Sequence, residues 1–287
     1  MITLSNGHQF EFSVASGALG FDGRGYLWEW PFCVAGLIDP AFFTIVAKTV
    51  TLQPRTGNLR WSHPWSVVSW LRGGGVVNAI GLTNPGIDAW VEQYYPIAKA
   101  RRWSLAVSIA AEGEAELREM ASRLEPLSLP FIELNASCPN TASELLENTA
   151  RVVGLCKALK DATRHPIVVK LSVVHDYRAI AQATEGVVEA ISINSVPWEV
   201  FDPRSKSPLA KFGGGGVSGK IAQPFTWKMA RELSRTTKTP VIAAGVWQYD
   251  DIKKLLNLGA KAVAFGSIFL RYPWRPTRFV KRWRCAR

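Results

Sequence analysis

The side chains best suited to chemistry lie in residues 131–140, which read Phe-Ile-Glu-Leu-Asn-Ala-Ser-Cys-Pro-Asn. The first four residues predict a short buried strand. Hydrogen-bonding side chains and a thiol follow at once, at Asn135, Ser137, Cys138 and Asn140. Polar and nucleophilic groups at the C-terminal end of a buried strand are typical of α/β enzymes, whose sites are assembled there. The alternative is a capping turn before a helix that begins near Ser143.

A glycine-rich segment at 213–219 could approach a phosphate. It contains a formal G-x-G-x-x-G at Gly214, Gly216 and Gly219. We expect no strand before it and find no acidic residue about 20 positions later, so the dinucleotide-binding motif does not fit. We interpret the segment as a loop whose backbone amides can contact a phosphate. A merely flexible loop is the alternative.

Two further features predict a phosphorylated or anionic ligand. Gly245 and the pair Gly266 and Ser267 end the last two expected strands, and in barrels the loops after strands 7 and 8 commonly bind phosphate. Lys48 and Lys170 lie inside otherwise apolar strands, where an unpaired ammonium group is costly. We expect each lysine to meet an anion, such as a reduced flavin or a substrate carboxylate. The alternative is a lysine that reaches water at a strand end.

Metal and disulfide chemistry find no support in the sequence. The four histidines (His8, His63, His165 and His175) fall at no ligand spacing, and the four cysteines (Cys33, Cys138, Cys156 and Cys285) form no C-x-x-C pair. We therefore expect no metal, no iron–sulfur cluster and no disulfide framework. A reducing cytoplasm is the expected location.

The elements that must position these side chains alternate along the chain. Strands are predicted at 12–17, 43–49, 76–81, 104–109, 131–134, 167–172, 190–195, 241–245 and 262–267. Helices are predicted at 114–124, 143–160, 176–185, 224–236 and 248–258, with N-caps at Ser143 and Asp176 and a C-cap at Gly259. This alternation predicts a parallel α/β sheet, either a closed barrel or an open doubly wound sheet, in one domain. Nine strands are one more than an eight-stranded barrel takes.

The amino-acid composition fits a globular α/β protein. The chain has 287 residues, 47% hydrophobic and 20% charged. We expect no signal peptide, because no basic start precedes an apolar run, and no membrane span. Seven of the 34 Lys and Arg residues lie in 271–287, which holds no acid, so the other 270 residues carry only +4. Such a tail could meet RNA, an acidic partner or anionic lipid, but we favour a solvated helix face, with neither membrane nor nucleic acid as partner.

Together the motifs resemble those of the FMN-dependent dihydroorotate dehydrogenases of pyrimidine biosynthesis. The similar stretches follow one another in order at 15–17, 48–58, 78–86, 133–140, 169–172, 194–195, 215–219 and 266–267. The resemblance implies an eight-stranded (β/α)8 TIM barrel, with 78–86 in an excursion after the second barrel strand. The sequences of residues 48–58 and 78–86 are most similar to those of class 1B enzymes.

The resemblance also implies roles for individual residues. Cys138 matches the base that removes a proton from C5 of dihydroorotate while a hydride passes from C6 to the flavin. Orotate-binding positions are matched by Lys48, Asn78, Gly81, Leu82, Asn135, Asn140, Asn194 and Ser195. Flavin-binding positions are matched by Ala15, Gly17, Lys48, Ser108, Lys170, Ser218, Gly219, Gly245, Gly266 and Ser267. Asparagines suit a ligand ring with both donors and acceptors.

The sequence departs from the family pattern at three places. Leu59 to His63 replace an expected proline-rich stretch, Val246 and Trp247 follow Gly245 where a second glycine is usual, and the loop at 141–147 is short. The class 1B wording implies an electron-transfer partner carrying FAD and an iron–sulfur cluster, with NAD as final acceptor, in a heterotetramer. A homodimer that uses fumarate or another soluble acceptor is the alternative.

Two other functions compete. A tRNA-dihydrouridine synthase is also an FMN barrel with an Asn-x-x-Cys-Pro signature, and its basic surface would explain the charge. The stretches 48–58 and 78–86 match the dehydrogenase better. A non-catalytic barrel subunit is the other alternative, and the retention of the substrate-type residues argues against it.

Overall fold

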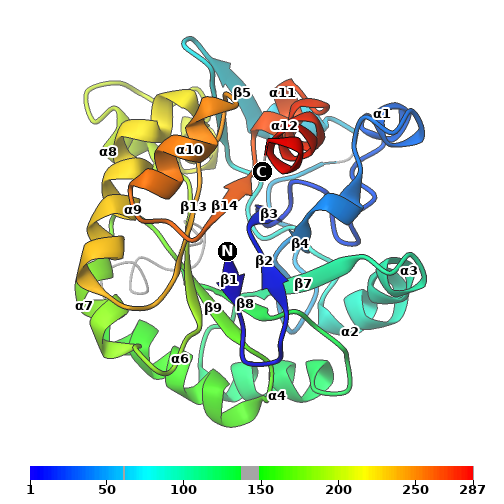
Figure 1. Ribbon diagram of the computed structural model, residues 1–287, viewed down its shortest axis with the longest axis vertical. Coiled ribbons are helices and arrows are strands. Elements are labelled where there is room, and N and C mark those ends of the chain that lie inside the picture. The colour runs from blue at the N-terminus through cyan, green and yellow to red at the C-terminus, as the bar shows by residue number, and fades with distance from the viewer. Residues whose placement is uncertain (61, 137–148, 287) are drawn as a thin grey trace.

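Eight parallel strands close into a barrel in the computed structural model, which describes residues 1–60, 62–136 and 149–286 (Figure 1). In chain order they are β3 (Phe12–Val14), β4 (Thr44–Val46), β7 (Ser104–Ile109), β8 (Ile132–Asn135), β9 (Ile167–Leu171), β10 (Ala190–Ile193), β13 (Val241–Ala243) and β14 (Ala262–Phe265). Each pairs with its neighbour in sequence order, and β14 closes onto β3. The predicted eight-stranded barrel is confirmed.

Helices surround the barrel on its outer side (Figure 1). They are α1 (Trp30–Val34), α2 (Ile87–Ala89), α3 (Tyr95–Ala100), α4 (Glu114–Leu124), α6 (Thr149–Ala162), α7 (Tyr177–Ala183), α8 (Trp198–Phe201), α9 (Gln223–Thr236), α10 (Asp250–Asn257), α11 (Ile268–Arg271) and α12 (Arg275–Cys285). Short turns of helix are η1 (Pro40–Phe42), η2 (Pro64–Val67), the π-helical η3 (Trp90–Tyr94), η4 (Ala210–Phe212) and η5 (Lys220–Ala222). None of the described helices is long and apolar enough to cross a membrane.

The predicted helices correspond to α4, α6, α7, α9 and α10. Asp176 caps α7 as expected, because its side chain accepts a hydrogen bond from the Ala179 amide. Gly259 follows the end of α10 with φ +108°, a conformation that favours glycine. The predicted cap at Ser143 lies outside the described residues.

The ninth predicted strand belongs to a second, smaller sheet. Its strands are β5 (Val68–Leu71), β6 (Gly75–Asn78), β11 (Val196–Pro197) and β12 (Gly216–Gly219), in the order β11-β12-β6-β5. This confirms the excursion implied for 78–86. It corrects the loop interpretation of 213–219, because Gly216–Gly219 pairs with Gly75–Asn78 as an antiparallel strand. Only Gly213, Gly214 and Gly215, all with positive φ, remain in the expected loop.

Alternation along the barrel strands sorts their side chains into layers. A small interior cluster, continuous with the N-terminal hairpin β1 (Ile2–Thr3) and β2 (Gln9–Phe10), contains the apolar inward side chains Val46, Ala106, Phe131, Val168, Ala190, Ile242, Ala262 and Ala264. Two residues further along three of the strands, Glu133, Lys170 and Ser192 point to the same side. The barrel is therefore apolar near its amino-terminal end and polar near its carboxyl-terminal end.

Candidate active site

A cavity of about 310 Å³ lies at the carboxyl ends of the barrel strands, and the small sheet forms part of its wall. Its volume falls at the lower end of the range of small-molecule pockets. Residues at or after seven barrel strands contribute to it, among them Ala15, Lys48, Asn135, Lys170, Asn194, Gly245 and Gly266. β6 and β12 add Asn78 and Ser218. The cavity is thus the place where the predicted polar residues meet.

Nearly all described residues that the sequence predicted for a site line this cavity. Those predicted for the substrate are Lys48, Asn78, Gly81, Leu82, Asn135, Asn194 and Ser195. Those predicted for the cofactor are Ala15, Gly17, Lys48, Lys170, Ser218, Gly219, Gly245, Gly266 and Ser267. Cys138, predicted as the base, and Asn140, predicted for the substrate, lie outside the described residues, as does Ser137.

Ser108 is the exception among the described residues, because it does not line the cavity. It is fully buried in β7, and its hydroxyl lies 2.9 Å from Oγ1 of Thr49. Ser108 therefore supports a wall of the cavity from behind, which strand parity alone could not reveal.

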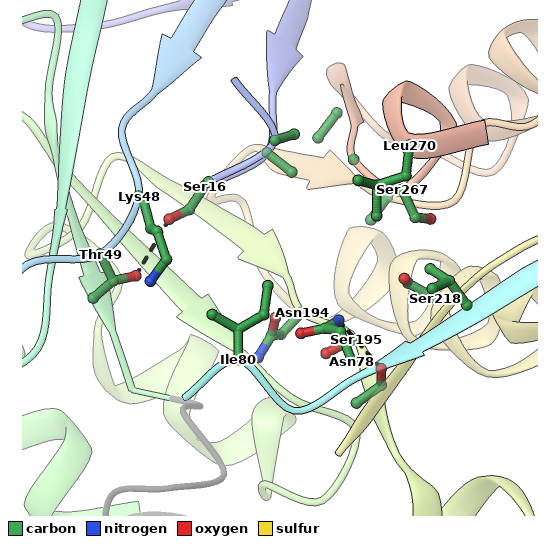
Figure 2. Close-up of a pocket in the computed structure, with 18 of the residues that line it drawn as sticks. Ser16, Lys48, Thr49, Asn78, Ile80, Asn194, Ser195, Ser218, Ser267 and Leu270 are labelled. Carbon is green, nitrogen blue, oxygen red and sulfur yellow. Dashed lines mark hydrogen bonds between the residues drawn. The ribbon is translucent and has the colours of Figure 1, made fainter. Parts of the chain in front are cut away.

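Lys48 lies at one end of the cavity. Figure 2 shows it beside Ser16 and Thr49, away from Ser218, Ser267 and Leu270. Its Nζ donates a 2.7 Å hydrogen bond to the carbonyl of Thr83, and the ammonium lies 5.7 Å from the centroid of the Phe21 ring. Gly17 leaves room for this side chain, since a Cβ at Gly17 would lie 3.3 Å from Cγ of Lys48. The excursion thereby holds a buried cation at the cavity wall.

Thr49 is a hydrogen-bond centre beside Lys48. Its Oγ1 accepts a 3.0 Å bond from Nδ2 of Asn135 and lies 3.2 Å from Oγ of Ser16 and 2.9 Å from Oγ of Ser108. These residues come from the ends of four barrel strands. Thr49 thus fixes the orientation of the Asn135 amide, a role that sequence reasoning missed.

Lys170 has an anionic partner within the barrel. Its Nζ lies 2.7 Å from Oε1 of Glu133, and Oε2 of Glu133 accepts a 2.9 Å bond from Ser192. All three side chains are buried and line the cavity floor. The expected match between a buried lysine and an anion is present, although the anion is a protein carboxylate. From the sequence, no role was predicted for Glu133, although its position two residues before Asn135 on the same strand face was the available signal.

The opposite end of the cavity is formed by small and hydroxylated residues. Gly245, Gly266 and Ser267 follow β13 and β14, while Ser218 and Gly219 come from β12. Figure 2 shows Ser218 and Ser267 on this side, with Asn78, Asn194 and Ser195 between the two ends. Bare backbone and hydroxyl groups suit an anionic group such as a phosphate.

The unusual sequence after Gly245 is accommodated without filling the cavity. Trp247 is buried against Tyr272, with ring centroids 5.8 Å apart. Its amide and that of Gln248 donate to Oδ2 of the buried Asp251, at 3.0 and 2.8 Å. The tryptophan therefore packs away from the cavity, whereas Val246 lines it.

An aromatic wall completes the cavity and was not predicted. Tyr26, Trp28 and Trp65 all line it; the rings of Tyr26 and Trp28 stack at 4.7 Å, and Trp65 lies 5.1 Å from Trp28. The Tyr26 hydroxyl donates to the carbonyl of Gly17 at 2.8 Å. Such rings offer flat apolar faces to a planar ligand.

A buried carboxylate stands behind this wall. Glu29 is fully buried, and its Oε2 accepts a 2.8 Å hydrogen bond from the Tyr26 amide. Its Oε1 has no hydrogen-bond partner among the described residues. Burial raises the pKa of Glu29 to about 7. The segment that carries the aromatic wall is thus built around a titratable group.

The arrangement suits a long ligand with one planar and one anionic end. A cation and amides surround one end, aromatic faces form a wall, and glycines and serines surround the other end. Among the described residues, no group of three or more His, Cys, Asp or Glu is placed to hold a metal ion. The lining therefore fits an organic cofactor with a phosphate, and a small polar substrate beside it.

Comparison with known families and proteins gives a consistent result. Residues 10–280 match the profile of the family described as dihydroorotate dehydrogenase. The catalytic subunit of dihydroorotate dehydrogenase B (NAD(+)) from Caldicellulosiruptor saccharolyticus is 32% identical over 263 residues, covering 89% of this chain and 82% of the relative. The corresponding subunit of Desulforudis audaxviator is 34% identical over 269 residues, covering 91% and 83%.

Two further similarities bear on acceptor class and fold. A protein of Aeropyrum pernix, provisionally named dihydroorotate dehydrogenase A (fumarate), is 32% identical over 265 residues, covering 89% of this chain and 81% of the relative. The crystal structure of the ligand-free DHODH of Eimeria tenella has a TM-score of 0.67 at 19% identity, covering 83% of this chain and 75% of that one. At that identity it supports the fold alone.

Proposed function

The chain belongs to the dihydroorotate dehydrogenase family, and on that premise we propose that it oxidises dihydroorotate to orotate in pyrimidine biosynthesis. The observation that carries the proposal is the cavity. It gathers residues that match orotate-binding positions and residues that match flavin-binding positions around one space.

The family is generally flavin-dependent, and FMN is the flavin that we propose for this cavity. Ser218, Gly219, Gly245, Gly266 and Ser267 would hold the phosphate, because they present small side chains and hydroxyls at the ends of β12, β13 and β14. Lys170 would face the ring from the floor, held in place by Glu133. A bound FMN supplies the hydride acceptor for the oxidation.

Substrate binding falls to the amide side chains and to Lys48. Asn78, Asn135 and Asn194 come from the small sheet and from two barrel strands, and each amide offers both a donor and an acceptor to the orotate ring. Lys48 would attract the carboxylate of the substrate. Asn140 is proposed as a further substrate contact by family resemblance.

Cys138 is proposed as the base that takes the C5 proton. The family resemblance carries this assignment. The segment that holds Cys138 continues directly from Asn135, which lines the cavity. A free cysteine thiol has a pKa of about 8.5, so nearby cations favour the reactive thiolate. Lys48 supplies positive charge to this cavity, whereas the charge of Lys170 is balanced by Glu133.

For the electron acceptor we propose a second protein subunit that carries FAD and an iron–sulfur cluster. The NAD-linked relatives are named as catalytic subunits, which supports this assembly. In the whole sequence, no C-x-x-C pair is present to hold a cluster.

The test is a visible spectrum of the purified chain, followed by anaerobic titration with dihydroorotate. We expect bound FMN whose absorbance is bleached by dihydroorotate. Cys138→Ala should retain FMN while the bleaching slows by about two to four orders of magnitude, the usual effect of losing a positioned base. A chain purified without flavin would favour a non-catalytic barrel. Bleaching of the variant at the wild-type rate would remove Cys138 from the mechanism.

A further inference from the structure

The surface formed by residues 27–37 is entirely apolar. Its exposed residues are Leu27, Trp30, Pro31, Val34, Ala35, Gly36 and Leu37. Glu29 is its only charged residue and is buried. Val34 is 90% exposed and Leu27 71% exposed, and α1 buries none of its residues. A soluble surface rarely presents so many projecting apolar side chains together.

Three exposed tryptophans extend this surface. Trp274 lies 5.8 Å from Phe32 of α1, and Trp65 lies 5.1 Å from Trp28. Trp70 is joined to Trp274 through Arg271 and Tyr272, whose side chains contact one another in turn. We call this surface the apolar face; it consists of Leu27, Trp30, Val34, Leu37, Trp65, Trp70 and Trp274. Of the large hydrophobic side chains that are exposed in the described part of the chain, only Met1 lies elsewhere.

A strongly basic helix borders the apolar face. α12 and α11 lie beside α1 and β5 at one end of the molecule (Figure 1). Residues 271–287 hold seven Arg and Lys and no acid. Within the described residues 271–286, the exposed cations are Arg271, Arg278, Lys281, Arg282 and Arg284. Several of them lie against aromatic rings, for example Arg282 over Tyr249 and Arg284 over Phe42. These contacts order the cations while leaving them exposed to a partner.

We propose that the apolar face and α12 dock this protein on the surface of an anionic lipid bilayer. A bilayer surface offers negative headgroups beside an apolar layer, which matches cations beside projecting Leu, Val and Trp side chains. Tryptophan is enriched at this depth of membranes, because its ring is apolar and its N–H is polar. A protein partner would need a separate pocket for each projecting side chain, whereas fluid acyl chains accommodate all of them.

Docking in this way would bring the cavity close to the membrane. Trp65 belongs to the apolar face and also lines the cavity, as does its contact Trp28. The exposed cations of α12 agree with the solvated helix face expected for residues 271–287, and docking on a bilayer adds a partner for that face.

The experiment is flotation of the flavin-loaded chain with vesicles of equal parts phosphatidylglycerol and phosphatidylcholine, and with vesicles of phosphatidylcholine alone. We expect binding to the anionic vesicles that weakens as salt is added. Val34→Glu should weaken it at least about tenfold, because a charge replaces an inserting apolar group. The double change Arg278→Gln and Arg284→Gln should do the same by removing two cations.

Matched control variants distinguish an effect of the apolar face and α12 from an effect of net charge alone. Ser122→Glu adds one negative charge on α4, and Lys157→Gln with Lys160→Gln removes two cations from α6, both away from α1 and α12 in Figure 1. These variants should bind like the wild type. Equal losses in controls and test variants would overturn the proposal.

Insertion is read by tryptophan fluorescence. Brominated lipids in the anionic vesicles should quench the wild-type fluorescence and quench Val34→Glu much less. Failure to float, or flotation without quenching, would overturn the proposal. Retention on immobilised polyglutamate that Val34→Glu abolishes, with no vesicle binding, would assign the face to an acidic protein and likewise overturn it.

Discussion

At the scale of single residues, the hydroxyl of Thr49 orders the part of the cavity where we propose that the substrate binds. It accepts the amide hydrogen of Asn135 and contacts Ser16 and Ser108. Thr49→Val keeps the shape and removes these bonds, so the Asn135 amide loses its fixed orientation. We expect orotate affinity to fall by about 1–3 kcal/mol while FMN stays bound. Titration of the flavin spectrum with orotate measures this.

Thr184→Val is the matched control for that change. Thr184 is fully buried in the C-terminal turn after α7 and donates to the carbonyl of Ile180 at 2.8 Å, outside the cavity lining. The same chemical change there should leave orotate affinity intact. Equal orotate affinity in both variants would mean that Thr49 does not position the substrate amide.

Glu29 gives the protein a specific dependence of stability on pH. Its pKa of about 7 in the folded chain exceeds the ordinary value of 4.5, because burial disfavours the charge. Between pH 4.5 and 7 the folded chain keeps a proton that the unfolded chain has lost, so this group makes stability fall as pH rises and adds nothing further above pH 7.

Replacing Glu29 with Gln should remove this dependence. The free energy of unfolding of Glu29→Gln, minus that of the wild type, should increase from pH 5 to pH 8 by roughly 1–3 kcal/mol. Urea unfolding at several pH values measures the difference, with the exposed Glu92→Gln as a control that should show no such trend. A difference that does not change with pH would mean that Glu29 is not titrating in this range.

At the scale of elements, the junction between β12 and β6 places Asn78 over the barrel. Gly215 has φ +83°, and a Cβ there would lie 2.5 Å from the backbone oxygen of Asn78. Gly215→Ala should therefore push β6 away and weaken orotate binding at least about tenfold, a cost of about 1.4 kcal/mol or more. Orotate titration and urea unfolding together measure the two effects.

Gly186 supplies the control for this prediction, because it lies outside the cavity lining. Its φ is +76°, but a Cβ there would meet no atom within 4 Å. Gly186→Ala thus bears the same left-handed strain, about 1–2 kcal/mol, without the collision. It should lose stability and keep orotate affinity. If both variants bound orotate equally well, the contact between Gly215 and Asn78 would not matter for the site.

The elements also show what the sequence could predict. The barrel strands were found because each is a short apolar run that ends in small or polar residues, as in Val241–Ala243 before Gly245. β12 was missed because a glycine-rich strand has little strand propensity of its own. Its pairing with β6 joins Gly216 to Asn78, and a contact so distant in sequence leaves no local pattern.

The cavity lining was also predicted only in part, because residues outside regular strands leave no local pattern in the sequence. Residues at strand exits, such as Lys48 and Asn194, follow from the barrel and the family motifs, and they line the cavity. Tyr26 and Trp28 belong to an irregular segment with no periodicity, so nothing in their spacing indicated a cavity wall. Ser108 shows the converse limit, because the family resemblance did not reveal that its side chain bonds to Thr49 and does not line the cavity.

At the scale of the whole molecule, the function depends on which acceptor takes the electrons from the reduced flavin. Relatives of similar identity are named for NAD and for fumarate, so overall similarity does not select the acceptor. An NAD site would have to be visible in the residues of this chain. Its G-x-G-x-x-G is divided between a turn and strand β12 instead of opening a helix after a barrel strand.

We therefore predict that NAD does not reoxidise the isolated, reduced chain at a useful rate. Direct hydride transfer would require the nicotinamide ring to lie against the flavin, and the sequence offers no fingerprint that would bind the dinucleotide there. The chain, reduced anaerobically with dihydroorotate, is mixed with NAD, fumarate or a soluble quinone, and the return of flavin absorbance is timed. Slow return with all three supports a second protein as acceptor and directs the search to a co-purifying subunit. Rapid return with fumarate would instead identify a chain that works without that subunit. Rapid return with NAD would contradict the prediction, and it would require a nicotinamide site within the cavity that neither the motif nor the fold indicates.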